Sequence, residues 1–208
     1  MHFTQVSFDV LSGVVASCIS GVFSLAQVFH VVRRRSVAGL SDVSWLLLAL
    51  SFATWLSFGL LTGDPYQVAT NFPSLLGSLW VVWQIHKQFP IKSSNLLLTG
   101  AFAGGSLLLQ IVGGVPGSLA AVLAVTGFVR FRQQRQIRSA PDVTGVAMSP
   151  WVVSSVAQVF WITHGWLTGN AVLLVHAPFA ILINVLLLVE VHRRRPKGFA
   201  RVRPGGLH

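Results

Sequence analysis

The stretch WLSFGLLTGD at residues 55–64 returns in altered form as WITHGWLTGN at residues 161–170. Both copies fit the pattern W-x-x-x-G-x-L-T-G-[D/N], and they stand 106 residues apart. Because the further matches fall on Trp, Gly and Gln rather than on common apolar residues, they indicate an internal repeat. The same shift, applied without a gap, pairs Gly21 with Gly127, Gln27 with Gln133, Gly39 with Gly145, Trp45 with Trp151 and His86 with His192.

The composition is that of a membrane protein. Of the 208 residues, 53% are hydrophobic and only 10% are charged, which is too apolar for a soluble domain of this size. The single cysteine, Cys18, cannot form an internal disulfide and says nothing about the redox compartment. A net charge of +10 would suggest a nucleic-acid partner in a soluble chain. The placement of the basic residues therefore has to decide between the two interpretations.

Seven segments are long and apolar enough to be transmembrane helices. A bilayer core about 30 Å thick requires roughly 20 helical residues, because backbone polar groups in lipid must be satisfied within the helix. The joints after the second, fourth and sixth segments are short and contain turn residues, whereas the other joints are basic. We therefore expect an all-α integral membrane protein. The expected spans are 11–32, 44–62, 66–86, 94–113, 116–135, 150–168 and 171–191.

The alternating joints place every basic cluster at one membrane face. Because Lys and Arg are retained on the cytoplasmic side, we expect the N-terminus outside and the basic tail, residues 194–208, inside. This placement favours the lipid bilayer of the plasma membrane as the partner and disfavours nucleic acid. The clusters are Arg33 to Arg35, Lys87 with Lys92, the arginines between 130 and 138, and the basic residues between 193 and 203.

The repeat predicts how the helices are grouped. Each copy contains three spans, which is an odd number, so a second copy joined directly to the first would enter the membrane from the opposite side. One extra crossing, residues 93–115, makes the two copies parallel, as in one class of transporter. We expect residues 1–92 to form the first three-helix unit and residues 116–193 to form the second. The extra helix is rich in glycine and alanine and is expected to be a closely packed spacer.

The residues resemble a family of sugar transporters. SLAQVFHVVRRRSVAGLS at 24–41 is similar to the PQ-loop signature, and its continuation through Trp55, Gly59 and Asn71 resembles the SWEET and SemiSWEET proteins. The resemblance covers almost the whole chain. It implies a 3+1+3 arrangement of seven helices and transport of sugars by alternating access.

Several positions depart from the family pattern. The proline of the PQ pair is Ala26 in the first copy and Arg132 in the second, so Gln27 and Gln133 stand without it. The family also implies a hinge proline at the start of the second helix of each copy. The first such position holds Ser44.

Three prolines remain as candidate hinges. Pro150 holds the family's second hinge position, although Ser149 and Pro150 also fit an ordinary helix start with an N-cap and proline at N1. Pro73 and Pro178 each lie early in the third helix of a copy, where proline can kink a helix. We expect Gln27, Gln133 and these prolines to act in hinging or gating.

A tryptophan and an amide are expected near the middle of the membrane. Trp55 lies eight residues before Gly63, and Asn71 lies eight residues after it, so both are about 12 Å below the turn. Sugars present apolar C–H faces that pack on aromatic rings, and hydroxyls that bond to amides. We expect Trp55 and Asn71 to line a solute site, as the resemblance also implies. Alternatively, the tryptophan fills space between helices and Asn71 bonds to a neighbouring carbonyl.

The second copy differs at this depth. Trp161 matches Trp55, but Ala177 stands where the first copy has Asn71. His176, one position earlier, is expected to supply the polar contact or to couple transport to protons. A neutral histidine bonded between helices is an equally good interpretation, and His164 lies nearby in the sequence.

Three functions are open at this point. The leading hypothesis is a passive facilitator of a mono- or disaccharide. The alternatives are a proton-coupled carrier of amino acids or other small solutes, as among PQ-loop relatives, and a non-transporting membrane adaptor. We expect neither an enzyme nor a cofactor or metal, because no paired carboxylates or histidines with metal-ligand spacing occur at depth. One chain holds both copies, so a monomer can suffice, and a homo-oligomer stays open.

Overall fold

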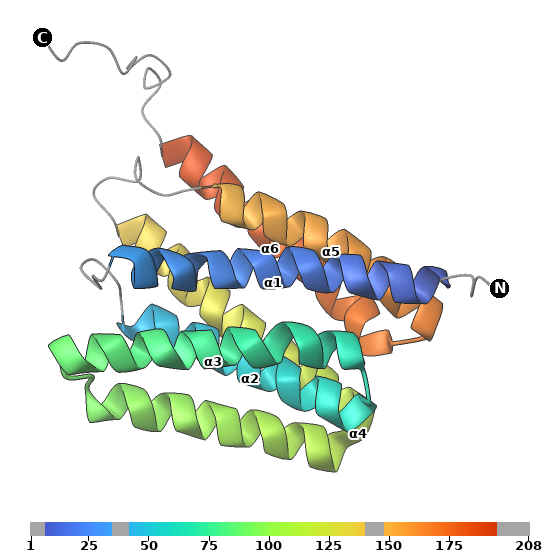
Figure 1. The fold of residues 1–208 in the computed structure, drawn as a ribbon, viewed down its shortest axis with the longest axis horizontal. Helices are drawn as coiled ribbons and strands as arrows, with labels where there is room; N and C mark the ends of the chain where they lie inside the picture. Colours follow the sequence, from blue (N-terminus) through green and yellow to red (C-terminus); the bar gives the residue numbers. More distant parts are fainter. Residues whose placement is uncertain (1–6, 35–41, 140–147, 195–208) are drawn as a thin grey trace, which may run out of the picture.

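The computed structural model describes residues 7–34, 42–139 and 148–194. Within these ranges the chain is almost entirely helical and contains no strand. Figure 1 shows the helices lying side by side along the long axis of the molecule. Their bounds are α1 Phe8–Arg34, α2 Asp42–Thr62, α3 Pro65–Gln88, α4 Ser93–Ser139, α5 Ser149–Thr168 and α6 Ala171–Arg194.

Helix α4 consists of two helical segments joined by a sharp reversal. At Gly114 the backbone has φ 54° and ψ −134°, outside the helical region, and the chain turns back on itself there (Figure 1). A Cβ atom at Gly117 would run into the carbonyl of Leu109, so the two segments touch where they meet. Within the described residues the chain has six helical elements. The spans predicted at 94–113 and 116–135 correspond to the two segments of α4, and the break at Gly114 lies at the joint predicted between them. The seven-helix arrangement of the SWEET type stays a prediction.

The first segment of α4 packs against α2 through hydrogen bonds. Ser106 Oγ donates to Thr54 Oγ1 at 3.2 Å, and Gln110 Nε2 donates to the Thr54 carbonyl at 3.3 Å. The expectation that its glycines provide close packing is not met. Apart from neighbouring backbone of the chain itself, no atom lies within 4 Å of the Cβ position at Gly100, Gly104, Gly105, Gly113 or Gly114.

Three of the described helices, α2, α4 and α6, are long and apolar enough to cross a membrane. Helix α3 is less apolar than α2 because its inward side is polar. This is the reverse of a surface helix in a soluble protein, which turns its polar side to water. Its buried polar residues are Gln67, Thr70, Asn71, Ser74 and Ser78. Its outward side, about half exposed, carries Phe72, Leu76, Leu79 and Trp83.

The repeated motif forms the same tight turn twice. In the first copy, Gly63 has φ 68°, a left-handed conformation that glycine adopts without strain. The Asp64 N–H donates to the Gly59 carbonyl at 2.9 Å, and the Asp64 carboxylate caps α3 by accepting from two backbone N–H groups. In the second copy, Gly169 has φ 66°, and the N–H of Asn170 donates to the carbonyl five residues earlier at 2.8 Å.

The other glycine that both copies of the motif share lets the helices on either side of the turn approach closely. A Cβ at Gly59 would lie 2.7 Å from the Cβ of Gln67 in α3. A Cβ at Gly165 would lie 2.8 Å from the Cβ of Leu173 in α6. Neither position can accept a side chain unless the helices move apart. Of the two glycines in the motif, the second forms the turn and the first allows the close contact between the helices.

The six helices form a closed ring of contacts. Helix α3 touches α1 and α2, and α6 touches α4 and α5 in the same order. Two further contacts, α1 with α5 and α2 with α4, join the halves of the chain. The predicted boundaries of the two units stay predictions, and the tail beyond Arg194 lies outside the described residues.

Two apolar clusters follow the repeat position by position. Each buried residue of the first cluster stands 106 positions before one of the second. The two halves of the chain therefore bury equivalent side chains between equivalent helices. The first cluster contains Trp45, Val81 and Ile85, and the second contains Trp151, Leu187 and Val191.

We expect Gly59→Ala and Gly165→Ala each to destabilise the protein by about 1–3 kcal/mol, because a methyl group must be forced into a packed interface. The measurement is thermal unfolding of the purified protein in detergent. Gly104→Ala is the matched control, since its Cβ position is open and alanine favours a helix over glycine. Equal melting temperatures for all three variants would contradict the close approach.

Candidate functional site

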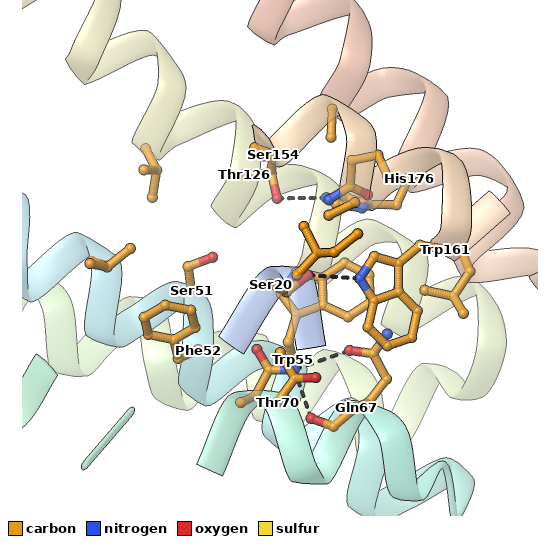
Figure 2. A pocket seen from close by; sticks show the side chains of 18 of the residues that line it. Ser20, Ser51, Phe52, Trp55, Gln67, Thr70, Thr126, Ser154, Trp161 and His176 are labelled. Carbon is orange, nitrogen blue, oxygen red and sulfur yellow. Dashed lines mark hydrogen bonds between the residues drawn. The ribbon is translucent and has the colours of Figure 1, made fainter. Parts of the chain in front are cut away.

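A cavity of about 190 Å³ lies inside the ring of helices. Every helix contributes to its lining, and Figure 2 shows the labelled side chains around it. The four residues predicted to bind a solute, Trp55, Asn71, Trp161 and His176, all line this one cavity. The structure therefore brings together side chains that are up to 121 residues apart in the sequence.

The two tryptophans reach the cavity from equivalent helices. Trp161 of α5 is 5% exposed, and its Nε1 donates to Ser20 Oγ of α1 at 3.2 Å. Trp55 of α2 packs edge-on against the His176 ring, with 4.5 Å between ring centroids. Both indoles also pack against apolar side chains of the core, so part of each ring fills space between helices. The remaining part is presented to the cavity.

Asn71 forms an amide pair within α3. Its Nδ2 donates to the Gln67 carbonyl at 2.8 Å and to Gln67 Oε1 at 3.0 Å. These two bonds match the two hydrogens of the group. The interpretation that Asn71 bonds to a neighbouring carbonyl is thus correct for its amino group, although the residue also lines the cavity. Gln67, which the sequence analysis missed, lines the cavity one helical turn before Asn71.

His176 is held by a neighbouring helix. Its Nε2 lies 2.9 Å from Thr126 Oγ1 of α4, and the residue is 5% exposed. Thr70, its counterpart in the first copy, also lines the cavity. Ala177 is buried in an apolar cluster with Trp161. The second copy therefore presents an imidazole at the depth where the first copy presents a hydroxyl and an amide.

A cation also lines the cavity. Arg130 of α4 donates from one guanidinium nitrogen to Gln133 Oε1 at 2.9 Å, and both residues belong to the lining. The sequence analysis treated Arg130 only as part of a basic cluster that sets the orientation. Its spacing of four residues from Thr126 and three from Gln133 is the signal that places all three on one side of a helix.

The predicted hinge residues are distributed over the bundle. Gln133 lines the cavity, whereas Pro73 lies inside α3 and Pro178 inside α6. Gln27 lies in α1 and Pro150 near the start of α5, but their side chains are outside the described part of the structure.

The alternative helix start at Ser149 is only partly correct. Proline does follow in the first turn of α5, but the N-cap is Met148, and it makes no side-chain capping bond. Ser149 is instead the first residue of the helix. The hinge function of Pro150 stays a prediction.

Tyr66 packs tightly at the turn end of the bundle, defined here as the end that carries the reversals at Gly63, Gly114 and Gly169 (Figure 1). A Cβ at Gly13 of α1 would lie 2.6 Å from the Tyr66 ring. Ser17 Oγ of α1 donates to the Tyr66 carbonyl at 3.1 Å. The tyrosine therefore fills the space between α1 and α3.

His164 of α5 completes this closure from the other half of the chain. Its Nδ1 lies 3.0 Å from the Asp9 carbonyl of α1, and its Nε2 lies 3.6 Å from Asp64 Oδ2. Because a carbonyl only accepts, Nδ1 must donate in this contact, and an ion pair with Asp64 requires a second proton on Nε2. The ring also meets the Tyr66 ring edge-on at 5.1 Å. One side chain thus joins α1, α3 and α5.

Comparisons with models of known protein families, with curated proteins and with solved structures find no match. The functional argument therefore rests on the geometry of the site. Within the described ranges, no cluster of His, Cys, Asp or Glu could hold a metal ion, and no acidic residue lines the cavity. The cavity offers indole faces, amides, hydroxyls, an imidazole and a guanidinium, a set suited to binding a small polar solute.

We expect Asp64 and His164 to be energetically coupled by about 0.5–3 kcal/mol, as residues in direct contact usually are. The test is a double-mutant cycle on thermal stability with Asp64→Asn and His164→Phe. Each change introduces the residue that the other copy has at the equivalent position, Asn170 or Phe58, and asparagine preserves the helix cap.

A matched cycle serves as the control. Asp42 is the first residue of α2, and its Oδ1 accepts from the Val43 N–H at 2.7 Å. Asp42→Asn combined with His164→Phe should show additive effects, because the two residues belong to helices that make no direct contact with each other. Additive effects for the Asp64 pair as well would mean that the turn end is not held together by this contact.

Proposed function

We propose that the protein is a membrane transporter that carries a small polar solute by alternating access, in the manner of the SWEET-like proteins that its sequence resembles. The single observation that supports this best is the cavity. It is enclosed by all six helices and receives an equivalent tryptophan from each half of the chain. Transporters built from repeats place their solute site at the interface between the repeats.

The proposed topology has seven crossings. The two segments of α4 cross the membrane separately, so that α1 to α3 form one unit and the second segment of α4 forms the other with α5 and α6. The turn end lies outside and the opposite end, with its basic residues, faces the cytoplasm of the cell. The equivalent contacts of α1 with α5 and of α2 with α4 support this division, because each joins the first helix of one unit to the second helix of the other.

The lining fits a sugar-like solute. An indole face packs against the C–H groups of a pyranose ring, and amides exchange hydrogen bonds with its hydroxyls. Since the amino hydrogens of Asn71 are already used, its carbonyl oxygen and the amino group of Gln67 are the groups available to a solute. The cavity is smaller than pockets that bind drug-sized ligands, which have volumes of about 300–1,000 Å³. A monosaccharide is therefore favoured over a larger solute.

The contacts at the turn end supply a gate. Tyr66 and His164 seal this end, whereas the lining continues to Gln133 in the part of α4 that leads to the basic end. In the transport cycle, rocking of one unit against the other would part His164 from Asp9 and Asp64 and open the turn end. The same motion would close the cavity near Gln133.

Trp55→Ala and Asn71→Ala should each reduce solute flux by at least about 10-fold, because each removes a direct contact with the solute. The measurement is uptake into liposomes that contain the purified protein, with a panel of labelled hexoses, hexuronates and amino acids. The fastest solute is then used for the variants.

Two matched substitutions test whether the loss is local. Trp83→Ala removes a tryptophan that is 49% exposed on the outward side of α3, and Asn95→Ala removes an amide of α4 that does not line the cavity. Both should keep flux within about twofold of the unmodified protein. Equal flux in all four variants would refute the site, and the absence of uptake for every solute on the panel would refute the transport function.

A further inference from the structure

Arg130 gives the cavity a property that a site for neutral sugars does not need. The guanidinium is half-buried at the cavity wall and keeps its charge under all physiological conditions. Its hydrogen bond goes to Gln133 Oε1, a neutral acceptor. Among the described residues, two carboxylates lie against other side chains, Glu190 against Arg138 and Asp64 against His164.

The other arginines of the same cluster do not line the cavity. Arg132 lines a separate small pocket on the other side of α4, together with Asn95 and Phe128. Arg135 is exposed, and Arg138 lies 3.5 Å from Glu190. Orientation of the chain in the membrane explains these three. It does not require a fourth arginine to line the central cavity.

The charge has no counterpart in the first copy. The position equivalent to Arg130 is Ser24, so the fold does not require a cation there. A charge inside an apolar bundle is costly unless it has a partner, and such residues commonly mark a path for a charged solute. With no acidic residue among the described lining, the missing partner is best supplied by the solute itself.

We propose that the cavity binds a small hydroxylated solute that carries one carboxylate, a sugar acid of the hexuronate type, and this rests on the transport function proposed above. The planar guanidinium can hold a carboxylate through two parallel hydrogen bonds. The tryptophans pack on the ring, and Asn71 and Gln67 bond its hydroxyls. An amino acid fits less well, because its ammonium group finds no acidic residue in the described lining.

The test compares two sugars that differ at one carbon. D-glucuronate has a carboxylate where D-glucose has a hydroxymethyl group, and both are offered to liposomes that contain the purified full-length protein. D-glucuronate should be taken up faster. Arg130→Ser, which introduces the residue of the first copy, should reduce D-glucuronate flux at least about 10-fold more than it reduces D-glucose flux, because only the carboxylate uses the charge.

Two further variants control for charge and position. Arg130→Lys keeps the charge but loses the paired geometry, so its D-glucuronate flux should lie between those of the unmodified protein and Arg130→Ser. Arg135→Ser removes an exposed cation of the same helix and should leave both fluxes within about twofold. If Arg130→Ser does not fold, thermal stabilisation of the unmodified protein decides: D-glucuronate should raise the melting temperature more than D-glucose, by an amount that high salt reduces.

The outcomes separate this inference from the proposed function. Uptake of D-glucose without D-glucuronate, or an equal loss of both in Arg130→Ser, overturns the carboxylate site and leaves transport intact. If Arg130→Ser does not fold, equal stabilisation of the unmodified protein by the two sugars overturns the carboxylate site. Failure of every solute to enter the liposomes contradicts the transport function itself.

Discussion

The bundle carries its large apolar side chains outward, and this constraint determines what its interior can be. Polar groups on α3 cannot bond to an apolar exterior, so they must find partners within the ring of helices. Asn71 bonds back to its own helix, while Ser106 and Gln110 of α4 bond to Thr54 of α2. Polar side chains of the cavity wall, such as Asn71 and His176, take part in this internal pairing. The polar cavity is thus a consequence of where polar residues can be tolerated.

The two copies of the sequence keep the scaffold and differ at the site. Turns, close helix contacts and the clusters around Trp45 and Trp151 are equivalent, and they fix the distance between neighbouring helices. At the cavity and its closed end, however, equivalent positions of the two copies carry chemically different side chains. Thr70 of the first copy, for example, corresponds to His176 of the second. Backbone geometry is therefore shared by both halves, whereas charge and hydrogen bonding have diverged.

Much of the fold could be predicted because its signals are local. Length and hydropathy located the helices, and Gly63 with Asp64 marked a helix end followed by a helix cap. Depth could also be counted along a helix, and Trp55 and Asn71, which were expected at one depth, both line the cavity. The short joint predicted after residue 113 likewise coincides with the break in α4 at Gly114.

The contacts between distant helices could not be predicted in the same way. Whether a side chain faces the cavity depends on the rotation of its helix, and hydropathy does not reveal this for a short polar run such as that around Arg130. The meeting of His164 with Asp9 and Asp64 requires three helices to be placed correctly at once. In both cases the sequence identified the polar residues but did not predict which residues they contact.

The hairpin at Gly114 has a consequence for symmetry. Had the two halves been separate, identical chains meeting across a two-fold axis, every residue at their interface would occur in pairs. A single guanidinium could not exist there: the cavity would hold none, or two that repel each other. By tying both halves into one polypeptide, the extra helical segment allows an odd number of charges, and with it a cavity whose two walls differ in charge.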